Sequence, residues 1–315
     1  MNISRNMLSA LVAALAVLFA VSGKANAAAI DVLWYSYAHP TSEYISGIQT
    51  IASTAESYTQ ADGTEWALSI FAPGDAAPDF NAYDVLVVHS GEAFRTNAPG
   101  GPLETPEYSG ILSNRAAIEA ARGARTVISG SDADFHAVRG DTGNPGSPPP
   151  MTDAAWDGAL GHVVNAVNWA GAGSGLNIVS FYDGEFPGSF WWLDPDSFLR
   201  DELLGHTGHT RDNSPFLPPT LASLSINEGL TTLGLSNWRN SFHGNFALDI
   251  PGYSTAILDR EPAEGDPGFA LTIFRDDALA IAVPGPTTFW LFVLSIIFVV
   301  GLRRRVRCQG ESKPA

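Results

Sequence analysis

Short apolar runs and helical stripes alternate along this chain between residues 29 and 182. Five of the runs are rich in Val, Ile and Leu, and each is short enough to be a single strand. Because they are apolar nearly throughout, they are typical of strands that are buried on both faces. The predicted strands are residues 29–36, 65–73, 83–91, 125–130 and 176–182.

The segments between these runs carry apolar residues at helical spacing. The clearest helix is residues 152–171. Its apolar stripe consists of Trp156, Leu160, Val163, Val164, Val167 and Ala170. Residues 41–57 show the same spacing after a Thr-Ser N-cap, and residues 111–123 predict a short helix that Gly123 closes. Alternating strands and helices predict an α/β fold, with a mostly parallel sheet flanked by helices.

The later part of the body has a different pattern. Residues 253–259 and 268–274 are apolar and flank a polar turn, which predicts a hairpin or paired strands. Residues 183–227 are rich in Pro, Gly and Trp, and we expect them to be irregular and to cover the sheet edge or a site.

The first residues have the three parts of a secretory signal peptide. Arg5 supplies a basic start, residues 7–21 are almost entirely apolar, and residues 25–27, Ala-Asn-Ala, form a cleavage site. We therefore predict that signal peptidase removes residues 1–27 and that residues 28–282 form an exported α/β domain. The alternative is an uncleaved anchor, which the short apolar run disfavours.

A second apolar run, residues 287–302, contains no charge. It is followed by Arg303, Arg304, Arg305 and Arg307. A helix of about 1.5 Å per residue would fall short of a hydrocarbon core of roughly 30 Å, but the arginine stems can extend the span. We predict a transmembrane helix here, with residues 308–315 in the cytoplasm and the domain on the other side. A core helix is the alternative, but it should not end in an arginine cluster.

The motif before this helix is Val283, Pro284, Gly285 and Pro286. A Pro-containing motif, a short apolar helix and an arginine cluster, in this order, resemble the PEP-CTERM sorting signal of exported bacterial proteins. Gly285 stands where that family usually has Glu. The resemblance covers residues 283–307 only. It implies cleavage near the motif by an exosortase-like enzyme, a tether to the inner membrane before cleavage, and a cell-surface or extracellular product in an exopolysaccharide-producing cell.

The body between these two ends is acidic. Residues 28–282 contain ten arginines, no lysine and 32 acidic residues, a net charge of about −22. This charge argues against nucleic acids and anionic membrane surfaces as partners. The single cysteine, Cys308, lies in the predicted tail. The body therefore has no disulfide, no thiolate metal ligand and no cysteine nucleophile.

Polar residues follow three of the predicted strands, at residues 37–39, 89–92 and 129–140. Ligands of open α/β sheets bind beyond the carboxyl ends of the strands, so we expect these loops to meet. The stretches 83–91, 126–136 and 240–246 resemble the class I glutamine amidotransferase-like fold, a relative of the flavodoxin-like arrangement. The resemblance implies a nucleophile elbow between a strand and a helix, and a late histidine. The elbow of this chain has no cysteine, which excludes amidotransfer through a thioester.

Three interpretations of the elbow stay open. In a hydrolase, Ser131 would be the nucleophile and His243 the base. Asp132 or Asp134 would orient that base. In a divalent metal site, Asp132, Asp134 and His136 would be the ligands, because residues two apart in an extended segment point the same way. In the third interpretation, the aspartates cap the following turn and helix, and His136 bonds to the backbone.

Other residues carry weaker signals. His206 and His209 have the spacing of metal ligands on a helix, but the neighbouring glycines favour a loop. Phe190, Trp191 and Trp192 could stack on sugars if exposed, and we favour the alternative that they pack against the sheet. We expect a non-catalytic or ligand-binding envelope module, with extracellular polysaccharide as a candidate partner. The alternative is an Asp/His- or metal-dependent hydrolase.

Overall fold

The computed structural model describes residues 29–36, 47–49, 51–52, 65–90, 108–139, 157–182, 190–210, 215–236 and 243–277. The predicted signal peptide, sorting motif, helix 287–302 and tail lie outside these ranges. The chain divides into one unit that ends at Arg275 and a second from Asp276, of which two residues are described. None of the helices in the described ranges is both long and apolar enough to cross a membrane.

The first half of the sheet is parallel, and its five strands match the five predicted apolar runs. They are β1 (Ile30–Tyr35), β2 (Trp66–Phe71), β3 (Val85–Val88), β4 (Arg122–Ser129) and β5 (Leu176–Phe181). Their spatial order is β2-β1-β3-β5-β4, and every neighbouring pair is parallel. All four residues of β3 and all six of β5 are buried, as expected of strands covered on both faces.

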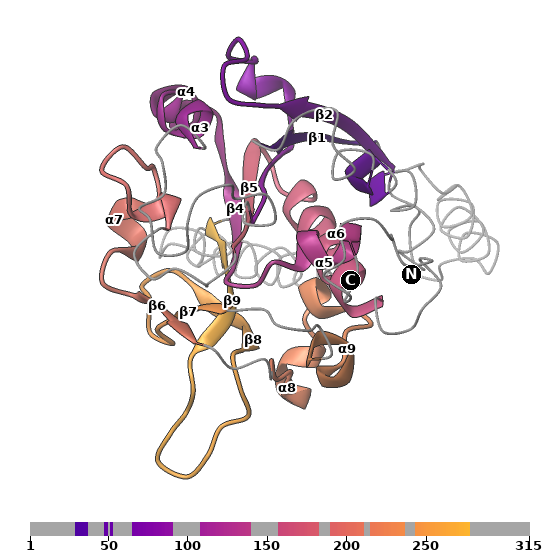
Figure 1. Ribbon diagram of the computed structural model, residues 1–315, viewed down its shortest axis with the longest axis vertical. Coiled ribbons are helices and arrows are strands. Elements are labelled where there is room, and N and C mark those ends of the chain that lie inside the picture. Colours follow the sequence, from indigo (N-terminus) through magenta and orange to yellow (C-terminus); the bar gives the residue numbers. More distant parts are fainter. Residues whose placement is uncertain are drawn as a thin grey trace, which may run out of the picture. The chain divides into compact units, whose positions relative to one another are not determined.

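The second half of the sheet has antiparallel pairs. Its strands are β6 (Thr207–Thr210), β7 (His243–Phe246), β8 (Ser254–Leu258) and β9 (Ala270–Asp276). β9 lies next to β4, the order continues to β7 and β6, and β8 pairs with β9. Figure 1 shows β1 and β2 at one end of the sheet and the antiparallel strands at the other. The predicted α/β class, with a mostly parallel sheet, is confirmed.

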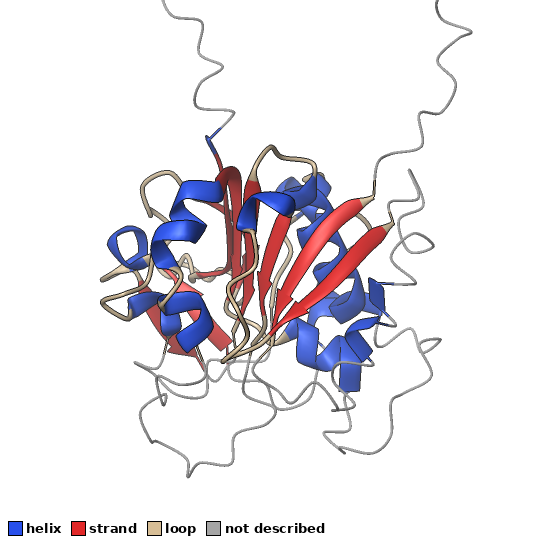
Figure 2. Ribbon diagram, turned by 90° about the horizontal axis from the view of Figure 1, so that it is seen from above, coloured by secondary structure: helices blue, strands red, loops and turns tan. Residues whose placement is uncertain are grey.

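Helices cover both faces of this sheet (Figure 2). The α-helices are α3 (Ser109–Leu112), α4 (Arg115–Ala121), α5 (Ala133–Arg139), α6 (Asp157–Gly171), α7 (Arg200–Leu203), α8 (Pro219–Ala222) and α9 (Thr232–Ser236). Short 3₁₀ turns are η1 (Phe80–Ala82), η3 (Trp191–Leu193) and η4 (Ser225–Asn227). Residues 47–49 and 51–52 are helical, and Ile48 and Ile51 are buried there.

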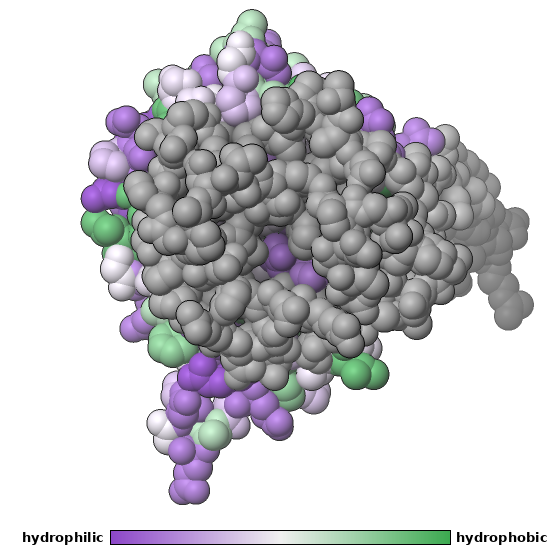
Figure 3. Space-filling model, viewed as in Figure 1, coloured by the Kyte–Doolittle hydropathy of each residue, from purple (hydrophilic) through white to green (hydrophobic). Residues whose placement is uncertain are grey.

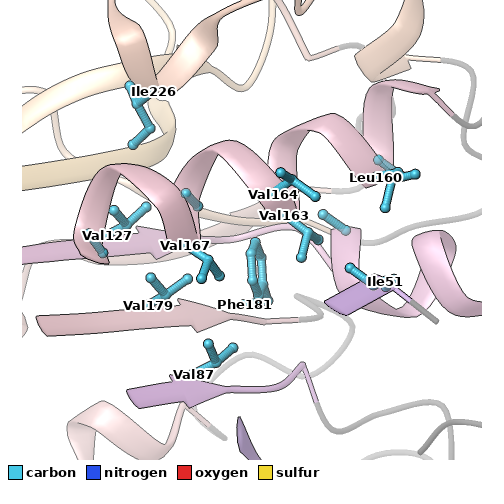
Figure 4. Close-up of a cluster of buried hydrophobic side chains, with 14 of the residues drawn as sticks. Ile51, Val87, Val127, Leu160, Val163, Val164, Val167, Val179, Phe181 and Ile226 are labelled. Atoms are coloured by element: carbon cyan, nitrogen blue, oxygen red, sulfur yellow. The ribbon is translucent and has the colours of Figure 1, made fainter. Parts of the chain in front are cut away.

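The core on one face is built around α6. The side chains of Val163, Val164 and Val167 point from this helix toward Val127 of β4 and Val179 of β5 (Figure 4), and all five are fully buried. Removing such a side chain from water contributes roughly 1.5–3 kcal/mol. The predicted stripe of helix 152–171 is therefore confirmed where the helix is described.

The predicted helix 111–123 is wrong as one element, because α3 ends at Leu112 and α4 begins at Arg115. The hydroxyl of Ser113 donates to the carbonyl of Ser109, and Asn114 Nδ2 donates to the carbonyl of Gly110 at 2.8 Å. Side chains that bond to the preceding turn compete with the helical backbone pattern. Periodicity alone gave no sign of this interruption.

The hairpin predicted from residues 253–259 and 268–274 is confirmed as the antiparallel pair of β8 and β9. The prediction of a loop at His206–His209 is wrong, because Thr207–Thr210 form β6 within the segment expected to be irregular. β6 pairs with β7, whose Phe246 lies opposite Thr207. Tertiary pairing outweighs the weak local preference of a Thr-Gly-His-Thr sequence.

A charged cluster, called here the arginine–glutamate cluster, lies at the first residue of β4. Arg122 forms two hydrogen bonds with Glu202 of α7, at 2.7 and 3.1 Å. The same carboxylate accepts from the Tyr253 hydroxyl and lies 3.2 Å from Arg275 Nη1. The side chains of Arg122, Glu202 and Arg275 are 16%, 22% and 27% exposed. The cluster therefore joins α7 to the sheet where water still reaches the charges.

Candidate functional site

The ends of three parallel strands meet at the predicted elbow. The backbone N–H of Ser90, after β3, donates to Asp134 Oδ2 at 3.0 Å. The N–H of Tyr182, after β5, donates to the carbonyl of Ser131, after β4, at 3.2 Å. The convergence expected of the loops after β3 and β4 is thus present, and residues 37–39, after β1, lie outside the described ranges. Figure 3 shows hydrophilic residues of the described chain near the middle of the face seen in Figure 1.

Two glycines bring the elbow against β7. A Cβ atom on Gly130 would lie 1.9 Å from the carbonyl oxygen of Gly244, so only glycine fits. The N–H of Gly244 donates to the carbonyl of Gly130 at 2.6 Å, and the N–H of Gly130 donates to the carbonyl of Leu271 at 2.8 Å. The antiparallel half therefore holds the elbow in place through backbone contacts.

The elbow serine belongs to a buried group that we call the hydroxyl–imidazole cluster: Ser129, Ser131, His162 and Thr272. Ser131 Oγ lies 2.9 Å from Ser129 Oγ. Ser129 Oγ also lies 2.9 Å from Thr272 Oγ1 and 3.1 Å from His162 Nε2. All four residues are inaccessible or nearly inaccessible to solvent. The Ser131 hydroxyl therefore has an internal partner and no exposed face.

The imidazole of this cluster is neutral at neutral pH. Complete burial lowers the pKa of His162 to about 4, because the charged form would lose its hydration. Its Nδ1 atom has no hydrogen-bond partner among the described residues. In a Ser-His-Asp triad an acid holds this nitrogen, so the cluster has the hydroxyl–imidazole contact of a triad without the orienting acid.

His162 lies within the predicted helix 152–171, where it is not part of the apolar stripe. Its role in the fold is structural. The ring is fully buried between α6 and the sheet, nearly perpendicular to the ring of Phe181. One signal was available. Ala159 and Ala166, one helical turn before and after it, are small and fully buried, which indicates that this side of α6 also faces the core. Ser129 and Thr272, on separate strands, had no such signal.

The backbone brings the strand that carries His243 next to the elbow that carries Ser131. His243 is the first residue of β7, and its neighbour Gly244 bonds to Gly130 of the elbow. The side chain of His243 lies outside the described part, as does that of His209. The pairing therefore stays a prediction.

The metal interpretation assumed an extended segment, and this assumption is wrong. α5 begins at Ala133, so Asp132 and His136 are one helical turn apart. His136 Nε2 lies 3.4 Å from Asp132 Oδ2, whereas Asp134 accepts from the N–H of Ser90. Among the described side chains, no three of His, Cys, Asp or Glu form a group that could hold a metal ion.

The capping interpretation also changes in detail. His136 pairs with the Asp132 carboxylate, and the carboxylate of Asp134 binds the end of β3. All three side chains are buried, and so is His89 just before Ser90. Burial lowers the pKa of His89 to about 3. The Asp134 carboxylate thus joins α5 to the end of β3, and the Asp132–His136 pair spans the first turn of α5.

The aromatic residues after β5 are not available for stacking. Phe190, Trp191 and Trp192 are buried, and Trp191 Nε1 donates to Ser180 Oγ of β5 at 3.2 Å. Phe190 and Trp192 stack with ring centroids 5.0 Å apart. The favoured interpretation, that they pack against the sheet, is confirmed.

Comparison of the chain with protein families, with curated proteins and with solved structures gives no match. The chemistry of the site therefore has to be inferred from its geometry. That geometry is a buried set of hydrogen bonds around an elbow whose serine is enclosed.

Proposed function

We propose that this chain is an exported α/β module of the cell envelope that acts by binding or by its structure rather than through a nucleophile at the elbow. The observation that carries the proposal is the enclosure of Ser131. Its hydroxyl is bonded to Ser129, and no part of the side chain reaches solvent. A nucleophile must meet its substrate within van der Waals distance, which this position does not allow.

A fluorophosphonate probe, which reacts with activated serines, tests this proposal directly. We expect the folded full-length protein to stay unlabelled, and Ser131→Ala to behave identically. Labelling of the wild type at Ser131, located by peptide mass spectrometry and absent from Ser131→Ala, would overturn the proposal.

Export and sorting are a second part of the proposal, supported by the sequence alone. Residues 1–27 serve signal peptidase, residues 287–302 tether the chain, and an exosortase-like enzyme cuts near Val283–Pro286. The domain is then periplasmic before cleavage and at the cell surface or outside the cell after it. Intact-mass analysis of the mature protein, from cells and from medium, decides this, because a mature chain that ends at Ala315 would show a permanent anchor.

The resemblance to the amidotransferase-like fold belongs to the same proposal. An elbow between β4 and α5 at the carboxyl edge of a parallel sheet supports it. The strand order departs from the flavodoxin-like 2-1-3-4-5 in the last two strands, since β5 lies between β3 and β4. Extracellular polysaccharide remains a proposed partner, through surfaces other than Phe190, Trp191 and Trp192.

The rival function is a hydrolase that uses Ser131, Asp132 and His243, or a divalent metal on Asp132, Asp134 and His136. What favours it is the buried Asp132–His136 pair beside the elbow. Thermal melts with and without EDTA test the metal form of this rival, because a bound ion stabilises the fold by linkage. We expect an unchanged melting temperature. A decrease with EDTA that disappears in Asp134→Asn would establish the metal site.

A further inference from the structure

β2 is the outermost strand of the parallel half. It pairs with β1 alone among the described residues, from Ile30 opposite Trp66 to Tyr35 opposite Phe71. The N–H of Ile30 donates to the carbonyl of Glu65 at 2.8 Å, which fixes which backbone groups face β1. In a parallel ladder alternate residues bond to the same neighbour. Ala67, Ser69 and Phe71 therefore face β1.

The backbone N–H and C=O groups of Trp66, Leu68 and Ile70 point the other way, along the edge. Proteins usually protect such an edge with charged residues, proline or a bulge, because it can accept another strand. β2 reads Trp-Ala-Leu-Ser-Ile-Phe and has no charge, proline or glycine. Ala67 is exposed, Leu68, Ser69 and Ile70 are half-buried, and Trp66 is buried, so water reaches the middle of the strand.

Charge decides what kind of strand fits this edge. Exposed Glu65 precedes β2, and exposed Asp75 and Asp79 follow it. If the β2 strands of two copies paired antiparallel, Glu65 of each copy would lie near Asp75 of the other, at both ends of the paired strands. Two acidic bodies of about −22 would also repel each other. An uncharged strand with basic residues at its two ends avoids both conflicts and gains attraction from the flanking carboxylates.

We propose that the β2 edge binds an extended segment of a partner protein as an added strand, and that this segment has an uncharged, β-branched middle and basic ends. Backbone bonds to Trp66, Leu68 and Ile70 supply the pairing, and the acidic flanks select the partner. The surface lies at the end of the sheet, away from the elbow, and does not depend on the proposed function.

The probe is a fluorescent peptide, Arg-Arg-Val-Thr-Val-Thr-Val-Arg-Arg, titrated with the full-length protein while anisotropy is measured. We expect saturable binding. A peptide with Glu in place of each Arg should bind at least about tenfold more weakly, because it meets like charges. A peptide of the same charge whose alternate residues are N-methylated should also lose about tenfold, because it cannot donate to the edge.

The matching protein variant is Ala67→Lys. This exposed position lies opposite Asp31, so the fold should stay as stable as the wild type, while a lysine on the edge repels the basic peptide. We expect at least about fivefold weaker binding. Ala263→Lys makes the same charge change at an exposed position between β8 and β9 and should bind like the wild type.

Equal binding by the N-methylated peptide, or by Ala67→Lys, would overturn the proposal, since attraction to an acidic body alone would explain both. Sedimentation of the protein without peptide tests whether a second copy of the chain occupies the β2 edge. A dimer that Ala67→Lys dissociates would show that a second copy covers β2 and would overturn the proposed partner.

Discussion

The two ends of β4 carry two polar clusters of opposite kinds. At its first residue, Arg122 belongs to the arginine–glutamate cluster, which is charged and partly exposed. At its last residue, Ser129 belongs to the hydroxyl–imidazole cluster, which is neutral and enclosed. One strand thus shows both solutions to burying polar groups: paired charges where water is near, and neutral hydrogen bonds where it is excluded.

The two clusters also differ in whether the pKa shifts of their residues favour the charged or the neutral form. Burial alone would lower the pKa of Arg122 and raise that of Glu202, but their mutual hydrogen bonds and charges more than offset this. The pKa of Arg122 is therefore raised and that of Glu202 lowered. His162 has no such compensation, and burial lowers its pKa. The charged cluster should resist changes in pH that disturb the neutral one.

The largest effect should come from removing the carboxylate of the charged cluster. Glu202→Ala leaves Arg122, Arg275 and the Tyr253 hydroxyl without their shared acceptor. We expect the free energy of unfolding in urea to fall by about 3 kcal/mol, at the low end for a buried pair because water reaches it. Glu119→Ala, which breaks the exposed pair with Arg115, is the control and should cost at most about 0.5 kcal/mol.

The next effect is acid destabilisation through His162. Its pKa is about 4 in the fold and about 6.5 in the unfolded chain, so the unfolded state binds more protons between these values. Stability should be complete above pH 6.5 and should fall as the pH decreases toward 4. By pH 5 the loss from this residue should be about 2 kcal/mol.

Urea titrations of the wild type and of His162→Gln at pH 7 and pH 5 measure this loss. The wild type should lose about 2 kcal/mol more than the variant between the two pH values. His89, whose pKa is lowered to about 3, contributes equally to both proteins and cancels. Equal losses in the two proteins would show that the ring of His162 is not excluded from water in the fold.

A smaller effect separates the two serines of the neutral cluster. Ser129 contacts Ser131, Thr272 and His162, whereas Ser131 contacts Ser129. Ser129→Ala should therefore cost about 1.5 kcal/mol and Ser131→Ala about 0.7 kcal/mol in urea unfolding. The double variant should cost less than the sum, because both changes remove the same bond. Additive losses would mean that the two hydroxyls do not interact.

The smallest effect is that of salt. Raising NaCl to about 1 M should reduce the cost of Glu202→Ala by about 0.5 kcal/mol, because the Debye length falls to about 3 Å. The cost of Ser129→Ala should not change, since no ion pair is involved. A similar salt response in both variants would remove the distinction between the clusters.

Much of the parallel half could be predicted from the sequence, because its strands are continuous apolar runs and α6 has a regular stripe. The antiparallel half could be predicted only at β8 and β9. β6 and β7 are Thr-Gly-His-Thr and His-Gly-Asn-Phe, which have little apolar alternation and become strands through their neighbours.

The candidate site was predictable in position and not in its contacts. The elbow lies between β4 and α5, as the order of the predicted elements indicates. Its hydrogen bonds, however, join residues far apart in the sequence: His162 lies 33 positions from Ser129 and 110 positions from Thr272. No local pattern encodes such pairs. The metal hypothesis depended on an extended backbone at residues 132–136, and the start of α5 at Ala133 redirects Asp134.

The place of β9 in the sheet has a consequence for synthesis on the ribosome. This strand is the last of the described chain to be made, yet it stands in the interior, beside β4, β7 and β8. Until its residues emerge, the nascent parallel half ends in an open edge at β4, and Gly130 has no Leu271 carbonyl to bind. A stop codon before residue 270 would thus leave incomplete sheets with open edges, prone to aggregation, instead of a shorter domain.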